Sequence, residues 1–199
     1  MGIICTDAGH GGTDSGAVWK NVREKDLNLT YTMDLNEELK KRGHQVFTTR
    51  TSDFTFPLGE RCNLVNTHHR AQQPRFDAIV SIHNNVAARQ DPATGEYKAL
   101  ANIEGFYAIY SEESPKSTKL ASKIAATVSS AGITQKHGGM LSTIDLGRTL
   151  AWIHKTTPPA TLLELGFMTN PGELDRLQDA SYRRKMVLAI ADGIESFLN

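Results

Sequence analysis

Hydrophobic positions along the chain fall into two patterns, one with helical spacing and one of short continuous runs. Between residues 26 and 42, Leu27, Tyr31, Leu35 and Leu39 recur every four positions, which predicts a helix with one apolar face. Gly43 is a suitable stop for that helix. Similar spacing predicts helices over 58–71, 117–130 and 182–198, the second with Leu58, Cys62, Val65 and His69 facing inward.

The continuous apolar runs predict buried strands between these helices. We expect strands over 3–5, 45–50, 77–82 and 105–110, with further apolar runs at 150–153 and 161–165. The segments 86–102 and 134–148 are polar or glycine-rich and are predicted to be loops. Strands that alternate with helices are typical of an α/β domain with a mostly parallel sheet. Because no linker or internal repeat interrupts the pattern, we expect one domain over residues 1–199.

Composition narrows the classes of function. The 199 residues carry 22 Lys and Arg against 22 Asp and Glu, so no excess of positive charge points to nucleic acid. No apolar stretch approaches the ~20 residues needed for membrane insertion. The two cysteines, Cys5 and Cys62, are too few for a disulfide scaffold. The N-terminus enters a strand directly, so no signal peptide is visible.

Four side chains that can bind metal or move protons lie next to predicted strands. His10 follows the first strand, His83 the third, and Glu164 ends the last, while Glu24 immediately precedes the first helix. Ligand sites in parallel sheets lie beyond the carboxyl ends of the strands, where these residues would meet. Two imidazoles and one carboxylate are a recurrent ligand set for catalytic zinc, and a further carboxylate can act as general base.

Each of these residues also has an ordinary structural interpretation. A single histidine after a strand is commonly a hydrogen-bonded loop residue, and no contiguous HExxH-type motif is present. Glu164 lies among apolar residues, where a charge is costly to bury without a partner or a task. A structural ion pair with an arginine would be one such partner.

Four motifs in register resemble the zinc-dependent N-acetylmuramoyl-L-alanine amidases with the "amidase 3" domain. They are the segment from Asp7-Ala8-Gly9-His10 to Ala17, the segment from Arg23-Glu24 to Leu29, Ser81-Ile82-His83-Asn84-Asn85, and the segment from Leu163-Glu164 to Asn170. Thr49, Arg50, Asp53, Leu58 and Arg61 also fall where that family's pattern expects them. The resemblance covers essentially the whole chain.

The resemblance implies a fold and a set of residue roles. It implies a three-layer αβα domain with a six-stranded twisted sheet, one Zn²⁺ held by His10, Glu24 and His83, and Glu164 as general base and then acid. Ala8 departs from the proline usual in the family, and 132–148 departs from the family's pattern. The segment between His83 and Gly105 is too short for the helical insertion that blocks the zinc in regulated members.

Three further residues are candidates for contacts around this site. Asn85 could orient a ligand or hydrogen-bond substrate, and Asp14 could accept a hydrogen bond from the free ring N–H of a ligating histidine. His154 ends an apolar run near the expected site and could contact substrate. His137 repeats the His-Gly-Gly pattern of His10, but it follows a polar stretch and is predicted to lie in a flexible loop.

These expectations describe a monomeric hydrolase that cuts the amide bond between the lactyl group of N-acetylmuramic acid and L-alanine in bacterial peptidoglycan. The alternatives are a zinc metallopeptidase acting within the stem peptides and a non-catalytic wall-binding module. Acting at the cell wall, the enzyme would be a secreted autolysin or sporulation enzyme, or a phage endolysin released at lysis.

Overall fold

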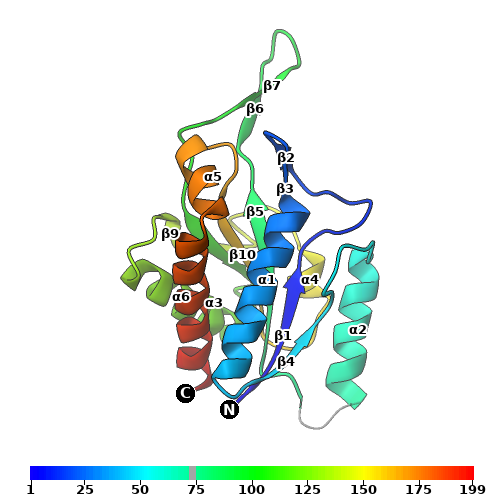
Figure 1. Ribbon diagram of the computed structural model, residues 1–199. Coiled ribbons are helices and arrows are strands. Elements are labelled where there is room, and N and C mark those ends of the chain that lie inside the picture. Colours follow the sequence, from blue (N-terminus) through cyan, green and yellow to red (C-terminus); the bar gives the residue numbers. More distant parts are fainter. Residues whose placement is uncertain (72–74) are drawn as a thin grey trace.

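The computed structural model describes residues 1–71 and 75–199, in which a six-stranded sheet lies between two layers of helices (Figure 1). The strands lie side by side in the order β4 (Gln45–Thr48), β1 (Ile3–Ala8), β5 (Ala78–Asn85), β10 (Ala160–Phe167), β8 (Phe106–Tyr110) and β9 (Gln135–Ser142). The first four are mutually parallel, β8 is antiparallel to β10, and β9 is parallel to β8. The predicted α/β architecture and mostly parallel sheet are confirmed.

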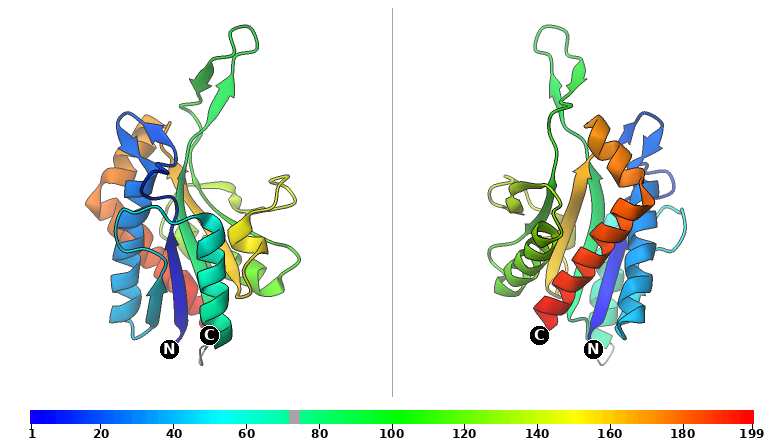
Figure 2. Two further views of the ribbon diagram at one scale, coloured as in Figure 1. Left: turned by 90° about the vertical axis from the view of Figure 1, so that its right-hand side faces the viewer. Right: turned by 60° about the vertical axis from the view of Figure 1, so that its left-hand side comes forward.

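The two faces of the sheet are covered unequally (Figure 2). One face packs against α1 (Glu24–Lys41), α3 (Pro115–Ser130), α5 (Pro171–Gln178) and α6 (Ala180–Leu198), and the other against α2 (Leu58–Ala71) and the short α4 (Ala151–His154). Ile82 and Leu163 point into the first core, while Ile79 and Leu162 point into the second. The second layer is shorter, which leaves part of its face of the sheet open.

Local signals explain where several helices begin and end. Ser114, Asn170 and Asp179 accept hydrogen bonds from the first turns of α3, α5 and α6, and Pro115 and Pro171 occupy first-turn positions. Gly43 follows α1 with φ +85°, a conformation that glycine adopts without strain. The predicted stop of the first helix is therefore confirmed, although α1 begins two residues before the expected start.

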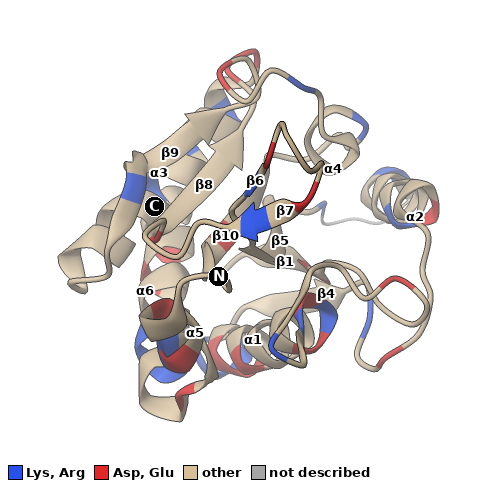
Figure 3. Cartoon of the chain, turned by 90° about the horizontal axis from the view of Figure 1, so that it is seen from above, with Lys and Arg blue, Asp and Glu red and all other residues tan. Residues whose placement is uncertain are grey.

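Several sequence predictions were wrong in regions without a strong hydrophobic pattern. The segment 134–148 contains the strand β9, which lies at the edge of the sheet and pairs only with β8. Its polar and glycine-rich sequence therefore has no neighbouring strand on its other side. His137 belongs to that strand rather than to a flexible loop. The segment 86–102 contains a hairpin of β6 (Ala88–Gln90) and β7 (Tyr97–Ala99) that projects above the sheet (Figure 1). In the view from above, β6 and β7 overlie the middle of the molecule (Figure 3).

Two more differences concern helices. The apolar run 150–153, which the sequence left without an assigned element, forms most of the helix α4 and the residue before it, and α5 was not predicted at all. Leu58 begins α2 but is 51% exposed, so it does not face inward with Cys62, Val65 and His69, which are buried. None of the described helices combines the length and the apolar character that crossing a lipid bilayer requires.

Candidate metal centre and active-site pocket

A row of side chains crosses three neighbouring strands near the carboxyl ends of β5 and β10, which is the amino end of the antiparallel β8. His83 on β5 is the register partner of Glu164 on β10, and Glu164 is in turn opposite Tyr107 on β8. Register partners project to the same face of a sheet, here the partly open face beside α2 and α4. The neighbours of Glu164, Leu163 and Leu165, project to the opposite face. Strand alternation thus explains how a carboxylate fits into an apolar segment.

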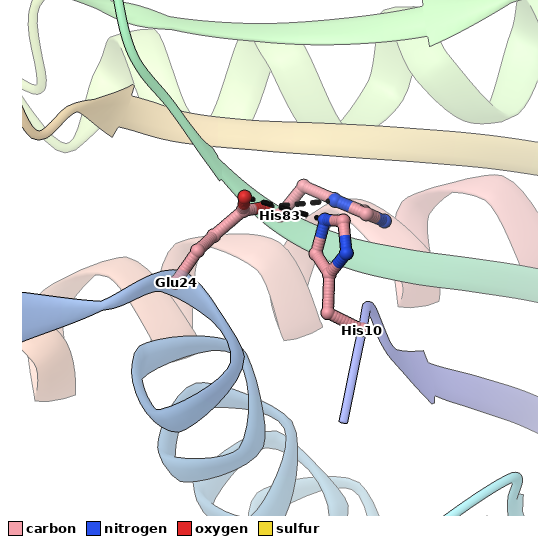
Figure 4. Close-up of side chains that lie close together, drawn as sticks. All are labelled: His10, Glu24 and His83. Atoms are coloured by element: carbon pink, nitrogen blue, oxygen red, sulfur yellow. Dashed lines mark hydrogen bonds and ion pairs between the residues drawn. The ribbon is translucent and has the colours of Figure 1, made fainter. Parts of the chain in front are cut away.

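Glu24 joins the two histidines from a different element (Figure 4). Its Oε1 lies 2.9 Å from Nδ1 of His83, and its Oε2 lies 3.2 Å from Nε2 of His10. The two imidazole rings are 4.9 Å apart between centroids and nearly perpendicular. One ligand atom from each of the three residues lies within 4.8 Å of the others, so this group could hold a metal ion.

The position of Glu24 follows from how α1 begins. The amide groups of Glu24 and Lys25 donate to the carbonyls of Ala17 and Ser15, which ties the helix start to the loop that carries His10. The amides of Ala17 and Asn84 donate to the carboxylate of Glu24. A helix amino terminus favours a negative charge. Burial opposes ionisation, but the hydrogen bonds with His10 and His83 outweigh it and hold the pKa of Glu24 well below its usual range.

His10 is held by a carboxylate on each side of its ring. Its Nδ1 lies 2.8 Å from Oδ2 of Asp14, and its backbone has φ +63° in the loop after β1. Burial would lower the pKa of His10, but the contacts with Glu24 and Asp14 outweigh it and raise that pKa to about 9. Asp14 therefore lies where a second carboxylate can fix the orientation of a ligating imidazole, as the sequence analysis expected.

Two glycines leave the space that the site occupies. A Cβ atom on Gly9 would lie 2.2 Å from Nε2 of His83, and one on Gly16 would lie 2.6 Å from Oε2 of Glu24. Gly16 also has φ +61°, which side chains rarely adopt. The glycine-rich loop is therefore required sterically, because the backbone of the His10 segment passes directly against two of the candidate ligands.

Two buried arginines stabilise the loop that carries His10. Arg50 donates to the carbonyls of Ala8, Gly9 and Lys25. Arg61 bonds to Asp7 and to carbonyls that include those of Ala8 and His10. Both guanidinium groups are nearly inaccessible to solvent. Both arginines fall within the family resemblance of the sequence, and the structure shows that they donate to backbone carbonyls around the site.

Glu164 differs from Glu24 in its hydrogen bonding. Its Oε2 is buried and makes no hydrogen bond, and no ion pair forms at Glu164 within residues 1–71 and 75–199. The structural ion pair considered from the sequence is therefore not seen there. Burial raises the pKa of Glu164 to about 7, against the opposing effect of nearby His83. A carboxylate with such a pKa can both accept and donate a proton near neutral pH.

These residues line one pocket of about 420 Å³. Its walls include His10, Glu24, His83 and Glu164, and beside them the apolar side chains of Phe56, Leu58, Leu150 and Trp152. Asn85 also lines the pocket, where its amide donates to the hydroxyl of Tyr107. Arg148 lies in the same wall and was not singled out from the sequence, because an arginine in an irregular segment carries no positional signal.

His154 is the one candidate that the structure does not bring into this pocket. It is exposed and lines a separate hollow with Thr143 and Thr149. Its Nε2 lies 3.3 Å from the hydroxyl of Thr143, and its Nδ1 accepts from the amide of Leu150. Both ring nitrogens are thus occupied in bracing the loop 143–150.

The donor set fits a zinc ion. Zinc in catalytic sites takes nitrogen and oxygen ligands from three residues and leaves a position open for water or substrate. The three candidate ligands come from a loop, a helix start and a strand, and the imidazole of His10 has the outer carboxylate that such ligands usually carry. The unpartnered oxygen of Glu164 lies in the same pocket and is left over for proton transfer.

The chain is similar to known proteins over nearly its whole length. The Bacillus subtilis (strain 168) protein YqiI, whose function is uncharacterised, is 33% identical over 98% of this chain and 84% of its own length. The probable cell wall amidase LytH of Staphylococcus aureus is 28% identical over 98% of this chain, which spans only 58% of that relative.

Solved structures show the same fold. The catalytic domain of CwlV, an N-acetylmuramoyl-L-alanine amidase from Bacillus (Paenibacillus) polymyxa var. colistinus, superposes with a TM-score of 0.81 at 28% identity, over 100% of this chain and 98% of that one. An N-acetylmuramoyl-L-alanine amidase from Clostridium difficile 630 gives a TM-score of 0.81 at 28% identity over 98% and 96% of the two chains.

Residues 4–196 match the sequence pattern of one family, described as N-acetylmuramoyl-L-alanine amidase, and this match takes in every residue of the candidate metal centre. The protein therefore belongs to the N-acetylmuramoyl-L-alanine amidase (amidase 3) family.

Proposed function

We propose that this protein is a zinc-dependent hydrolase that cleaves the amide bond between the lactyl group of N-acetylmuramic acid and L-alanine in bacterial peptidoglycan. One observation carries the proposal: a His–Glu–His ligand group and an unpartnered carboxylate line the same pocket. Membership of the amidase family and the amidase names of its relatives support the same substrate class. We assign the site of action to the bacterial cell wall.

His10, Glu24 and His83 would hold the ion. When bound, zinc supplies Lewis acidity that polarises the carbonyl of the scissile amide and makes an attacking water more acidic. Glu24 balances part of the positive charge, and Asp14 holds the ring of His10 through Nδ1. The amides of Ala17 and Asn84 keep the Glu24 carboxylate in place, so the ligand group is organised before substrate arrives.

Glu164 would move the proton. Its carboxylate accepts a proton from the water that attacks the amide carbonyl, and the same group then protonates the departing amine of L-alanine. A pKa of about 7 suits both steps, because neither protonation state is strongly favoured at neutral pH. Apolar neighbours such as Leu162 and Trp152 reduce solvation of the carboxylate, which raises that pKa.

Product analysis on purified peptidoglycan tests this proposal. The amidase releases intact stem peptides that begin with L-alanine and leaves sugar strands without peptides, and mass spectrometry identifies both. Shortened peptides would instead support a metallopeptidase acting within the stem. A protein that binds the wall and releases nothing, with or without added zinc, would contradict hydrolysis and favour a wall-binding module.

Two variants separate the roles of the residues. Glu164→Gln keeps the shape of the side chain but removes its basicity, so turnover should be lost while the zinc content, measured by atomic emission, stays at the wild-type level. His83→Ala should lower the zinc content itself. Full activity in the first variant, or full metal load in the second, would contradict the role assigned to that residue.

A further inference from the structure

Arg148 is a charged residue in the pocket wall to which neither the ligand group nor the proposed proton transfer gives a role. Among residues 1–71 and 75–199, four carboxylate residues and two arginines line this pocket: Asp7, Asp14, Glu24, Glu164, Arg61 and Arg148. Arg61 is committed to Asp7 and to backbone carbonyls. The guanidinium of Arg148, in contrast, makes no hydrogen bond or ion pair with residues 1–71 or 75–199.

Arg148 nevertheless lines the same pocket as Glu164 and the candidate metal ligands. Burial raises the pKa values of both Glu164 and Tyr107, and the positive charge of Arg148 acts against that rise at each of them. Arg148 is exposed, so its charge is available to a molecule that enters from solvent. The pocket therefore combines a ligand group for a cation with a separate arginine that can receive an anion.

The backbone around Arg148 is held in a defined shape. The amide of Arg148 donates to the carbonyl of Thr143, and the amide of Leu146 donates to that of Ser142. The hydroxyl of Ser142 donates to the carboxylate of Asp145 and accepts from the backbone amide of Asp145, and His154 bridges Thr143 and Leu150. These contacts close the loop 143–150 on itself, so Arg148 projects from a braced turn rather than from a free segment.

We propose that Arg148 determines specificity by binding a carboxylate of the stem peptide next to the scissile amide. This inference rests on the proposed function and deepens it. Its chemical basis is that guanidinium groups bind carboxylates through paired, charge-assisted hydrogen bonds. In the stem peptide the residue after L-alanine carries an α-carboxylate, which is free in some walls and amidated in others. Arg148 distinguishes the two forms because only the free carboxylate is charged.

Arg148 could instead act on the reaction centre, by stabilising negative charge at the amide carbonyl or by pairing with Glu164. In that case its removal would slow cleavage of every substrate equally. A substrate-carboxylate contact is different, since its loss affects only the substrate that has the carboxylate. The two roles are therefore separated by comparing two substrates that differ in that single group.

The experiment measures kcat/KM for zinc-loaded enzyme on N-acetylmuramoyl-L-alanyl-D-isoglutamate and on the corresponding isoglutamine, by chromatography of the released dipeptide. Wild type should prefer the carboxylate form by about 10- to 100-fold, the range expected for a hydrogen bond to a charged group. Arg148→Gln should remove this preference by lowering kcat/KM on the carboxylate form alone. Arg148→Lys should retain part of it, because the charge remains without the paired geometry.

Arg70→Gln is the matched control, because Arg70 is also exposed but lies at the far end of α2 and does not line the pocket. It should leave both rates unchanged. Equal losses on the two substrates in Arg148→Gln would overturn the specificity role, as would a wild-type enzyme that cleaves both forms at the same rate. Failure of wild type to cleave either substrate or whole peptidoglycan would overturn the proposed function itself.

Discussion

Replacing Gly9 by alanine tests the geometry of the metal centre with the addition of a single methyl group. The added Cβ would lie 2.2 Å from Nε2 of His83, whereas ordinary van der Waals contact begins near 3.4 Å. The imidazole, or the strand that carries it, must therefore retreat by about 1.2 Å. Gly9 does not adopt a left-handed backbone, so alanine introduces no local strain of its own.

A displacement of this size exceeds what a metal centre tolerates. Ligands and catalytic groups must be held to within about 0.5 Å of productive geometry, and a misplacement of about 1 Å can cost about 100-fold in rate. We expect Gly9→Ala to fold with a circular dichroism spectrum like that of wild type, to retain less zinc after dialysis, and to lose about 100-fold in peptidoglycan hydrolysis.

Gly59→Ala serves as the control, since Gly59 lies in α2 and a Cβ there would meet no atom within 4 Å. That variant should keep full zinc and activity and should be more stable by up to about 1 kcal/mol, the difference in helix propensity between the two residues. A Gly9→Ala protein with wild-type zinc content and wild-type activity would refute the reasoning, because His83 would then not need the position that the structure gives it.

Three other predictions follow from the buried charges. Glu164→Gln should stabilise the zinc-free protein above pH 7. In wild type the native pKa of Glu164, about 7, exceeds the ordinary value of 4.5, so the wild-type protein loses stability as the pH rises from 4.5 to 7. At about 1.4 kcal/mol per pKa unit this loss is up to about 3 kcal/mol, and glutamine, which does not ionise, avoids it. Urea unfolding with chelator at pH 5 and pH 8 measures this, and an equal effect of the substitution at both pH values would contradict it. Arg50→Ala should destabilise the fold by about 3–5 kcal/mol, because three buried carbonyls lose a charged donor; a thermal midpoint close to that of wild type would show that water replaces the guanidinium. Chelation of zinc should abolish hydrolysis and lower the thermal midpoint. If the free zinc concentration was 100 times the dissociation constant before chelation, the free energy of unfolding should fall by about 2.7 kcal/mol. An unchanged midpoint would argue against a metal held by His10, Glu24 and His83.

The sequence by itself was sufficient for the elements with strong periodicity and for the expectation that His10, His83 and Glu164 lie close together. The four-residue spacing from Leu27 to Leu39 predicted α1, because an apolar stripe of that period fits only a helix packed on a core. The buried runs predicted β1, β5 and β10, and the carboxyl ends of these strands predicted that His10, His83 and Glu164 are neighbours. The segments β9 and α5 were missed because an edge strand and a short surface helix bury too few apolar residues to leave a pattern.

Only the tertiary structure decided how these residues are placed in three dimensions. It paired Glu24 with both histidines while leaving an oxygen of Glu164 without a partner, and it showed that Gly9 is needed because His83 lies against its backbone. It excluded His154 from the pocket and brought in Arg148. Distances between residues far apart in the chain depend on strand order and register, which arise from the packing of the whole sheet, whereas periodicity is a local property of the sequence.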